Sequence, residues 1–227
     1  MDYDRLHRAL GDPTARHDMS RWASDVLSEI AQGRTRIAAV RHPLGFVCIP
    51  VERIGGQGIC VHVWSDHLTC ATSTTSAVHA HSWDLISYVL YGSLRNEVYE
   101  VTDVGPAGSA GKTTYRVFEI HSGGDSDEVL QTPRLVHCEM TSAEVNHEGD
   151  AYALPAGIFH ATVVQGEAAT MALGSGRPQG MDLSLGGIDT TTHRVRRQRC
   201  DRDDTARVAQ MVVKRLARIR AAGQEVR

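Results

Sequence analysis

The first indication of the fold is HAHSWDLISYVLYGSLRNEVYEV, residues 79–101. It joins a His-x-His pair, His79 and His81, to a run of Leu, Ile, Tyr and Val residues that is typical of a β-strand. Residues i and i+2 of a strand point to the same side and lie about 6.5–7 Å apart, so both imidazoles can lean onto one metal ion at about 2.1 Å each. Histidine pairs of this spacing also arise by chance, and the metal interpretation therefore needs support from elsewhere in the chain.

That support comes from GDAYALPAGIFH, residues 149–160. Gly149, Pro155, Gly157 and His160 follow the pattern G-x5-P-x-G-x2-H, and a chance match to all four positions is rare. Proline and glycine define a tight approach to a strand, after which a histidine enters on a fixed face. The pattern therefore predicts His160 as a third histidine for the same site.

The two segments resemble the two motifs of the cupin superfamily, G-x5-H-x-H-x3,4-E-x6-G and G-x5-P-x-G-x2-H. His79, His81 and Gly92 match the first motif, whose leading glycine is replaced here by Ser73, and the second motif matches completely. The resemblance covers about residues 58–173. It implies an all-β fold, a jelly-roll β-barrel of cupin type with a metal held inside by both motifs.

The first motif departs from the family pattern at its glutamate, because Leu85 stands at that position and leucine cannot ligate a metal. Asp84 is adjacent, but strand alternation turns its carboxylate away from the barrel interior. The expected metal ligands are three neutral nitrogen donors with open coordination positions beside them. These ligands are His79, His81 and His160.

Three-histidine sites of this kind resemble those of the thiol dioxygenases and of other ring- or diketone-cleaving cupins, so the resemblance implies Fe²⁺ as the cofactor. Imidazole also suits Zn, Ni, Cu, Mn or Co, and ligand type alone does not name the metal. In the implied mechanism a small molecule chelates the ion and dioxygen takes the remaining position, which holds the two reactants together. The expected partners are this small-molecule substrate and dioxygen.

Other functions remain open at this stage. The ion can serve only as a Lewis acid, as in a non-redox isomerase, lyase or cyclase. The barrel can instead be a binding module that senses a ligand or metal and signals through its terminal helices. The expectation is a non-haem iron oxygenase or dioxygenase, although fold resemblance does not by itself transfer function.

Strand alternation also predicts a pocket beside the histidines. If Leu85 faces inward, the opposite face of its strand is apolar and packs against a second sheet, a helix or another protomer, so a homodimer is expected. That face carries Ile86, Tyr88 and Leu90. Trp83 can be plain core and Arg95 a solvated hairpin arginine. The candidates for substrate binding are Trp83, Leu85, Ser87, Arg95, Ile158 and Thr162.

A few other polar residues could act at the site or exchange protons, but no sequence pattern supports such a role. His62 and His67 precede the first motif and lie either beside the site or on the surface. Tyr152 and Glu97 can exchange protons, but nothing distinguishes them from ordinary strand residues. The cysteines are odd in number, widely spread and without a C-x-x-C pair, so they are expected to be reduced and structural. They are Cys48, Cys60, Cys70, Cys138 and Cys200.

The rest of the chain divides by its periodicity. Helical spacing of apolar residues predicts a helix from Asp18 to Gln32, with Asp18 as N-cap and Gly33 as C-cap residue. A second amphipathic helix is expected from Asp203 or Asp204 to Gly223. Short β-forming runs separated by turn clusters fill the middle, as in an antiparallel sandwich or barrel. The expected division is a helical extension over 1–35, the barrel over 36–173, a Gly/Arg-rich segment wrapping the surface over 174–202, and a C-terminal helix over 203–227.

Composition limits the partners. The 227 residues carry a formal net charge of −3, which gives no general attraction to nucleic acid or to an anionic membrane. The arginines of 194–199 lack interleaved aromatic residues and are expected to be solvated. No apolar run approaches the ~20 residues of a membrane span and no secretory signal begins the sequence, so a soluble, cytoplasmic protein is expected. Scarce lysine beside abundant arginine suggests a GC-rich bacterial genome.

Overall fold

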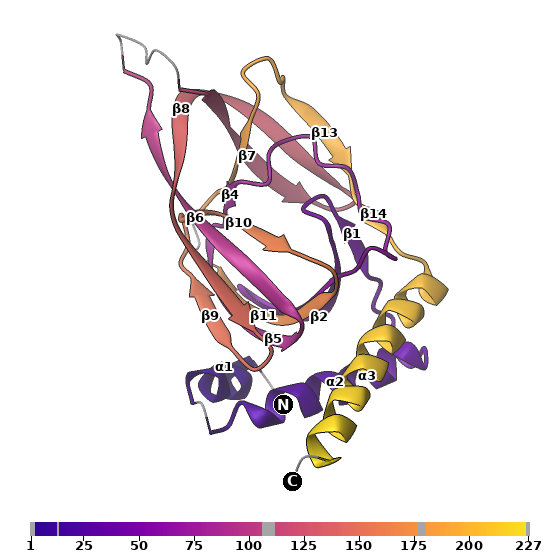
Figure 1. Cartoon of the computed structure of the whole chain (residues 1–227). Helices are drawn as coiled ribbons and strands as arrows, with labels where there is room; N and C mark the ends of the chain where they lie inside the picture. Colours follow the sequence, from indigo (N-terminus) through magenta and orange to yellow (C-terminus); the bar gives the residue numbers. More distant parts are fainter. Residues whose placement is uncertain (1–2, 13, 106–111, 177–179, 226–227) are drawn as a thin grey trace.

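A computed structural model of the chain describes residues 3–12, 14–105, 112–176 and 180–225. Two seven-stranded antiparallel sheets form the body of the molecule, and three helices gather at one end of it together with both termini (Figure 1). The expected all-β, jelly-roll-like fold with helices at both ends of the chain is confirmed. Within the described residues, no helix is both long and apolar enough to cross a membrane.

The first sheet, called here the helix-covered sheet, has the strand order β14-β1-β2-β3-β11-β5-β9. Successive side chains along its strands point alternately to an inner face, toward the other sheet, and to an outer face, toward the helices. They are β1 (Val40–His42), β2 (Phe46–Ile54), β3 (Gln57–Trp64), β5 (Trp83–Tyr91), β9 (Ala151–Leu154), β11 (Ala168–Gly176) and β14 (Gln198–Arg199).

The second sheet, called here the curled sheet, has the order β13-β8-β6-β10-β4-β12-β7, and β7 also pairs with β8. This additional pairing bends the sheet onto itself around a small apolar cluster that contains Val117, Val136, Phe159 and Leu185. Its strands are β4 (His79–Ala80), β6 (Ser93–Asp103), β7 (Thr114–Gly123), β8 (Ser126–His147), β10 (Phe159–Val164), β12 (Asp182–Gly186) and β13 (His193–Arg196).

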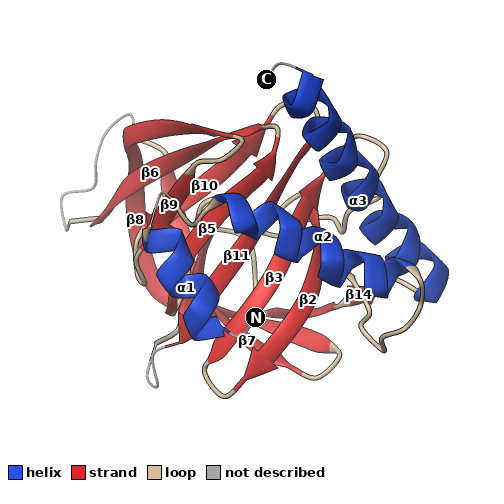
Figure 2. Cartoon of the chain, turned by 90° about the horizontal axis from the view of Figure 1, so that it is seen from below, coloured by secondary structure: helices blue, strands red, loops and turns tan. Residues whose placement is uncertain are grey.

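The helices α1 (Tyr3–Gly11), α2 (His17–Ala31) and α3 (Arg202–Glu225) cover the outer face of the helix-covered sheet (Figure 2). Tyr88 and Leu90 of β5 pack there in one buried cluster with helix residues such as Leu27 and Val212. Of the three coverings that the sequence left open for this apolar face, a second sheet, a helix or another protomer, the structure shows helices. Because the chain covers the face itself, the sequence argument for a homodimer loses its basis and the dimer stays a prediction.

The helices near the N-terminus differ in part from those that the sequence predicted. Helix α1 was not anticipated from the sequence. Helix α2 begins one residue earlier than expected with Arg16 at its N-cap, so Asp18 lies in the first turn and is not the cap. Gly33 has φ +67°, the left-handed conformation expected of a residue that ends a helix.

Helix α3 begins at Arg202, one residue before the expected start. The Asp204 backbone N–H donates to Asp201 Oδ1 at 2.7 Å, so Asp201 caps the helix rather than Asp203 or Asp204. The helix also passes Gly223 and ends at Glu225.

Part of the segment 174–202, which was expected to wrap the surface, forms the strands β12, β13 and β14. Strand β12 lies in this segment, between β4 and β7 in the curled sheet, with Ser184 and Leu185 buried. A Cβ on Gly186 would lie 2.6 Å from the Phe118 ring, so the glycine permits close packing of the strand against that ring. DLSLG is too short for its alternation to separate a strand from a loop, and residues 177–179 lie outside the described part of the chain.

The arginines of 194–199 are matched by acidic residues at the start of β8 and in the turn before it. Arg197 Nε donates to Asp127 Oδ1 at 3.0 Å, and Arg194 pairs with Glu128. Arg199 lies 3.1 Å from Asp125. These ion pairs balance much of the local positive charge.

Candidate metal centre

The three predicted histidines come together between the two sheets. His79 on β4 lies directly opposite His160 on β10 in antiparallel register, and His81 follows β4 by one residue. The ring centroids are 4.3 Å apart for His79 and His160, 4.8 Å for His79 and His81, and 5.0 Å for His81 and His160. One nitrogen of each ring lies within 4.8 Å of the others. Nitrogens bound at about 2.1 Å to one ion lie about 3–3.4 Å apart, so small ring movements bring all three to a metal.

Backbone carbonyls orient two of the rings in the same way. His79 Nδ1 donates to the Ala77 carbonyl oxygen at 2.9 Å, and His160 Nδ1 donates to the Ile158 carbonyl oxygen at 2.9 Å. A proton held on Nδ1 leaves the Nε2 lone pair free, which is how metal-binding histidines are commonly fixed in tautomer and direction. Both side chains are therefore prepared to ligate through Nε2.

His81 is held by a different contact. Its ring stacks on Trp83, with centroids 4.1 Å apart and an interplanar angle of 23°. Trp83 is the first residue of β5 and packs beside Leu85, so the stack links the end of the histidine pair to the inner face of the helix-covered sheet.

The second motif builds the turn that delivers His160. Gly157 occupies the third position of a turn closed by Ile158 N–H donating to the Pro155 carbonyl oxygen at 3.3 Å, and its φ of +83° favours glycine. Gly157 N–H also donates to the His81 carbonyl oxygen at 2.8 Å, which ties the two motifs together. Asp84 supports the turn from outside, since its Oδ1 accepts the Ala156 N–H at 2.9 Å.

The last glycine of the first motif has a steric role. Gly92 has φ +78°, and a Cβ there would lie 2.2 Å from the Glu167 carbonyl oxygen. Only glycine allows β5 to turn into β6 this close to β11. Ser73, which replaces the leading glycine, needs no such freedom, because no non-glycine residue in the described part of the chain has a positive φ.

Burial keeps the three rings uncharged at neutral pH. It lowers the pKa of His79 to about 3 and that of His81 well below its usual value, and in each case charge on a neighbouring histidine lowers it further. Burial also lowers the pKa of His160, whose side chain is among the most enclosed of the polar groups. Neutral imidazoles with free lone pairs are the form that binds a metal.

Leu85, at the position of the family glutamate, has apolar surroundings in the structure. Leu85 is 7% exposed and packs with Leu154, Ala172, Trp83 and Tyr152 on the inner face of the helix-covered sheet. Among the described residues, the ligand atoms that lie close to one another at this site come from the three histidines, and no carboxylate belongs to this group. The donor set is therefore neutral, as the sequence predicted.

Two other substrate-binding candidates also face the interior. Ser87 is fully buried and its Oγ donates to the Met171 carbonyl oxygen at 3.3 Å. Thr162, two residues after His160 on the same face of β10, donates to Asn96 Oδ1 at 2.9 Å. Whether either contacts a substrate stays a prediction.

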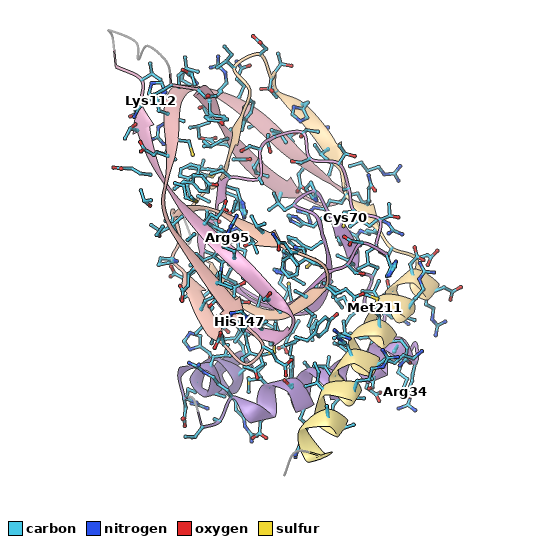
Figure 3. All side chains as sticks on the ribbon, viewed as in Figure 1. Arg34, Cys70, Arg95, Lys112, His147 and Met211 are labelled. Atoms are coloured by element: carbon cyan, nitrogen blue, oxygen red, sulfur yellow. The ribbon has the colours of Figure 1, made fainter. Side chains whose placement is uncertain are left out.

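Ile158 does not lie where strand alternation placed it, and Arg95 lies on the far side of its strand from the histidines. Ile158 belongs to the turn before β10 and is 39% exposed, so the alternation of the strand does not reach it. Arg95 lies opposite Val163, and therefore on the face of β6 that points away from His160. Its guanidinium reaches Glu97 at 2.5 Å and its side chain is 49% exposed (Figure 3).

A polar group beside the histidines was not anticipated. Asn96 Nδ2 and Thr170 Oγ1 are buried without a hydrogen-bond partner in the described structure. Burial raises the pKa of the Tyr152 hydroxyl, although Ser87, Asn96 and Thr170 lie close enough to lower it in part. No sequence signal identifies this group, because its members lie on four strands in two sheets that only the tertiary structure brings together.

The remaining polar candidates lie elsewhere or are already paired. His67 is exposed in the loop after β3, and Glu97 accepts the Tyr99 hydroxyl at 2.7 Å. Two surface cavities, of about 150 and 270 Å³, lie against α1, and neither is lined by the three histidines.

Comparisons with known proteins add little to this geometry. No protein-family model matches the chain, and no curated protein matches it. Among solved structures it is similar to hydroquinone 1,2-dioxygenase PnpCD in complex with Cd²⁺ and 4-hydroxybenzonitrile, with 15% identity over 57% of this chain and 63% of that one and a TM-score of 0.33. It is also similar to E. coli ycfD, with 12% identity over 74% and 47% of the two chains and a TM-score of 0.32.

The chain thus spans less than two thirds of the length of either similar structure. Both TM-scores are too low to carry an argument about activity.

Proposed function

We propose that the chain is a cupin-type, metal-dependent oxygenase that acts on a small chelating molecule at His79, His81 and His160. The observation that carries this proposal is the convergence of three neutral imidazoles from two distant segments, with no carboxylate among the mutually close ligand atoms of the described residues. Iron, dioxygen, a bacterial source and a cytoplasmic location stay predictions from the sequence.

The donor set fits a divalent first-row metal ion. Three imidazoles suit iron, zinc, copper, nickel or cobalt, and two of the rings are already fixed to ligate through Nε2. A bound Fe²⁺ would supply open coordination positions at which a bidentate substrate and dioxygen can meet. A site without a carboxylate leaves the ion its full positive charge, which favours anionic chelating groups on the substrate.

The surrounding side chains suggest how a substrate is oriented. Trp83 and Leu85 form an apolar wall on the inner face of the helix-covered sheet, which excludes water from the site. Tyr152 stays protonated because burial raises its pKa, so its hydroxyl can donate to an acceptor on the substrate. Asn96 Nδ2, which lies beside this hydroxyl, adds a second buried donor. These groups together would suit a compact substrate with a chelating end and a polar acceptor.

The test is anaerobic loading of the purified chain with Fe²⁺, followed by oxygen-uptake measurements against a panel of small thiols, catechols and β-diketones. We expect about one iron per chain and oxygen uptake with at least one class, lost in His160→Ala. Turnover with Zn²⁺ in the absence of oxygen would contradict the oxygenase proposal and favour Lewis-acid chemistry.

A further inference from the structure

A second group of metal-ligating side chains lies on the helix-covered sheet and shares no residue with the three histidines. It consists of Cys48 on β2 with Cys60 and His62 on β3. Cys48 lies directly opposite His62 in the antiparallel register, and Cys60 precedes His62 by two residues. All three side chains therefore project from the same face of two neighbouring strands.

That face is the inner one. His62 pairs with Thr170 and Cys60 with Ala172 on β11, and Ala172 belongs to the inner cluster around Leu85. The alternate residues of β3, such as Val61, pack instead with the helices. The group thus lies inside the barrel, where the charge of His62 is among the causes that lower the pKa of His81.

The three ligating atoms lie within 4.8 Å of one another, and both thiols are free. Two sulfurs bound at about 2.3 Å to a tetrahedral zinc ion lie about 3.8 Å apart, so about 1 Å of side-chain movement completes the geometry. Cys60 interacts through its side chain with both Cys48 and His62. The atoms a metal would join are already neighbours.

The surroundings hold the group in place. The His62 ring packs against Phe46, with centroids 4.5 Å apart, and meets Trp64 edge-on at 6.0 Å. The Arg53 guanidinium is close enough to act electrostatically on both thiols and offsets the charge of thiolate ligands. Arg53 thereby favours the thiolate form of both cysteines, which is the form that binds a metal.

We propose that Cys48, Cys60 and His62 form a second metal site, specific for a thiophilic d10 cation such as Zn²⁺. Two thiolates and one imidazole favour such an ion over Fe²⁺, whereas the three-histidine group lacks sulfur. Three protein ligands leave a fourth tetrahedral position open toward the barrel interior. The chain then carries two sites of different softness, and this inference does not depend on the proposed oxygenase activity.

The experiment uses the full chain, reduced with a phosphine and stripped with a chelator. The background variant is His160→Ala, which removes the first site from the measurement. We expect one Zn²⁺ per chain in this background, with X-ray absorption showing sulfur neighbours at about 2.3 Å. Only nitrogen and oxygen neighbours, or no bound zinc, would overturn the proposal.

Cys60→Ser in the same background should weaken zinc binding on the order of 100-fold, because a thiolate ligand is lost. The matched control is Cys70→Ser, a partly buried cysteine near Arg41 that lies outside the group (Figure 3). It should bind zinc as the background does. Equal zinc affinity in the Cys60 and Cys70 variants would refute the assignment.

A measurement on the unaltered chain covers the case in which Cys60→Ser fails to fold. Saturating Zn²⁺ should slow alkylation of Cys48 and Cys60 by iodoacetamide at least tenfold, while Cys70 reacts at an unchanged rate. Peptide mass mapping assigns each rate. Zinc-independent alkylation of Cys48 and Cys60 would overturn the proposal without any substitution.

Discussion

His79 and His160 lie directly opposite each other on neighbouring antiparallel strands, and each donates its Nδ1 proton to the carbonyl oxygen two residues before it. The two rings therefore share one tautomer and present Nε2 to the same space. In both cases the accepting carbonyl lies just before the strand that carries the histidine, since Ala77 precedes β4 and Ile158 belongs to the turn before β10. The pair is organised before any metal binds, which lowers the cost of binding one.

Loss of His160 should abolish metal uptake at the first site. His160→Ala leaves two nitrogen donors, and we expect bound iron to fall from about one per chain to roughly a tenth or less. Elemental analysis after anaerobic loading with Fe²⁺ and desalting measures the change. His121→Ala is the matched control, because His121 is exposed and lies 3.3 Å from Glu119 on β7. Stoichiometric iron in the His160 variant would remove that residue from the ligand set.

Placing the family glutamate at position 85 should lower the stability of the metal-free chain and raise its affinity for a metal ion. Leu85→Glu places a carboxyl in an apolar cluster, so we expect the metal-free variant to lose about 1–3 kcal/mol of unfolding free energy. A fourth, charged ligand should raise Zn²⁺ or Fe²⁺ affinity roughly tenfold or more. Isothermal titration and urea unfolding measure the two effects.

Leu85→Met is the control for Leu85→Glu, because it keeps the volume without adding a ligand. It should change neither quantity by much. Unchanged metal affinity in the glutamate variant would mean that position 85 does not face the histidines.

The metal-free chain should lose stability as the pH falls below about 6.5. Burial lowers the pKa of His42 and His79 to about 3 each, so the unfolded chain binds more protons than the folded chain between about pH 6.5 and 3. Stability is then full above this window and falls through it, by up to about 1.4 kcal/mol per pH unit for each such histidine. Urea unfolding at several pH values gives the slope.

His42→Asn isolates one contribution to that slope. The asparagine Oδ1 can still accept the Leu44 N–H that now donates to His42 Nδ1 at 3.3 Å, but the side chain no longer titrates. The slope should decrease by roughly one histidine's share. An identical slope in the variant would show that His42 is not held neutral by the fold.

The glycine that ends the first motif should be far less replaceable than another glycine of the same conformation. Gly92→Ala puts a Cβ 2.2 Å from the Glu167 carbonyl oxygen, whereas Gly55, also at positive φ, has nothing within 4 Å of that position. Both alanines carry the backbone strain, so the difference isolates the steric clash. We expect Gly92→Ala to cost about 1–3 kcal/mol more than Gly55→Ala in urea unfolding. Equal costs would mean that the backbone moves freely around Gly92.

Much of the metal centre could be predicted because its parts are local. The i, i+2 spacing of His79 and His81, and the turn through Pro155 and Gly157, depend on backbone sterics within a few residues. The resemblance to two family motifs then joined these segments before any coordinates did. The replacement of the family glutamate by Leu85 could also be recognised from the sequence, because the motif fixes its position relative to Gly92.

Reasoning from local sequence failed where the register between strands determines which face a side chain occupies. For Arg95 the sequence left open a substrate contact or a solvated hairpin position, and its pairing with Val163 turns it to the face away from His160, where it pairs with Glu97. Alternation was extended through a turn to Ile158, although a turn resets which side a residue faces. Strand β12 was missed because five residues carry too little pattern.

Residue spacing, together with the resemblance to two family motifs, was sufficient for the class of fold, the helix through Ala31, the C-terminal helix and the choice of the three histidines. Short-range sterics and alternation govern the local parts of these features. Tertiary structure alone decided that Cys48 meets Cys60 and His62, that Tyr152 faces Asn96, and that helices rather than a partner cover β5. Those contacts join residues far apart in the chain. They follow from which apolar surfaces bury one another, a property of the whole chain that no local pattern contains.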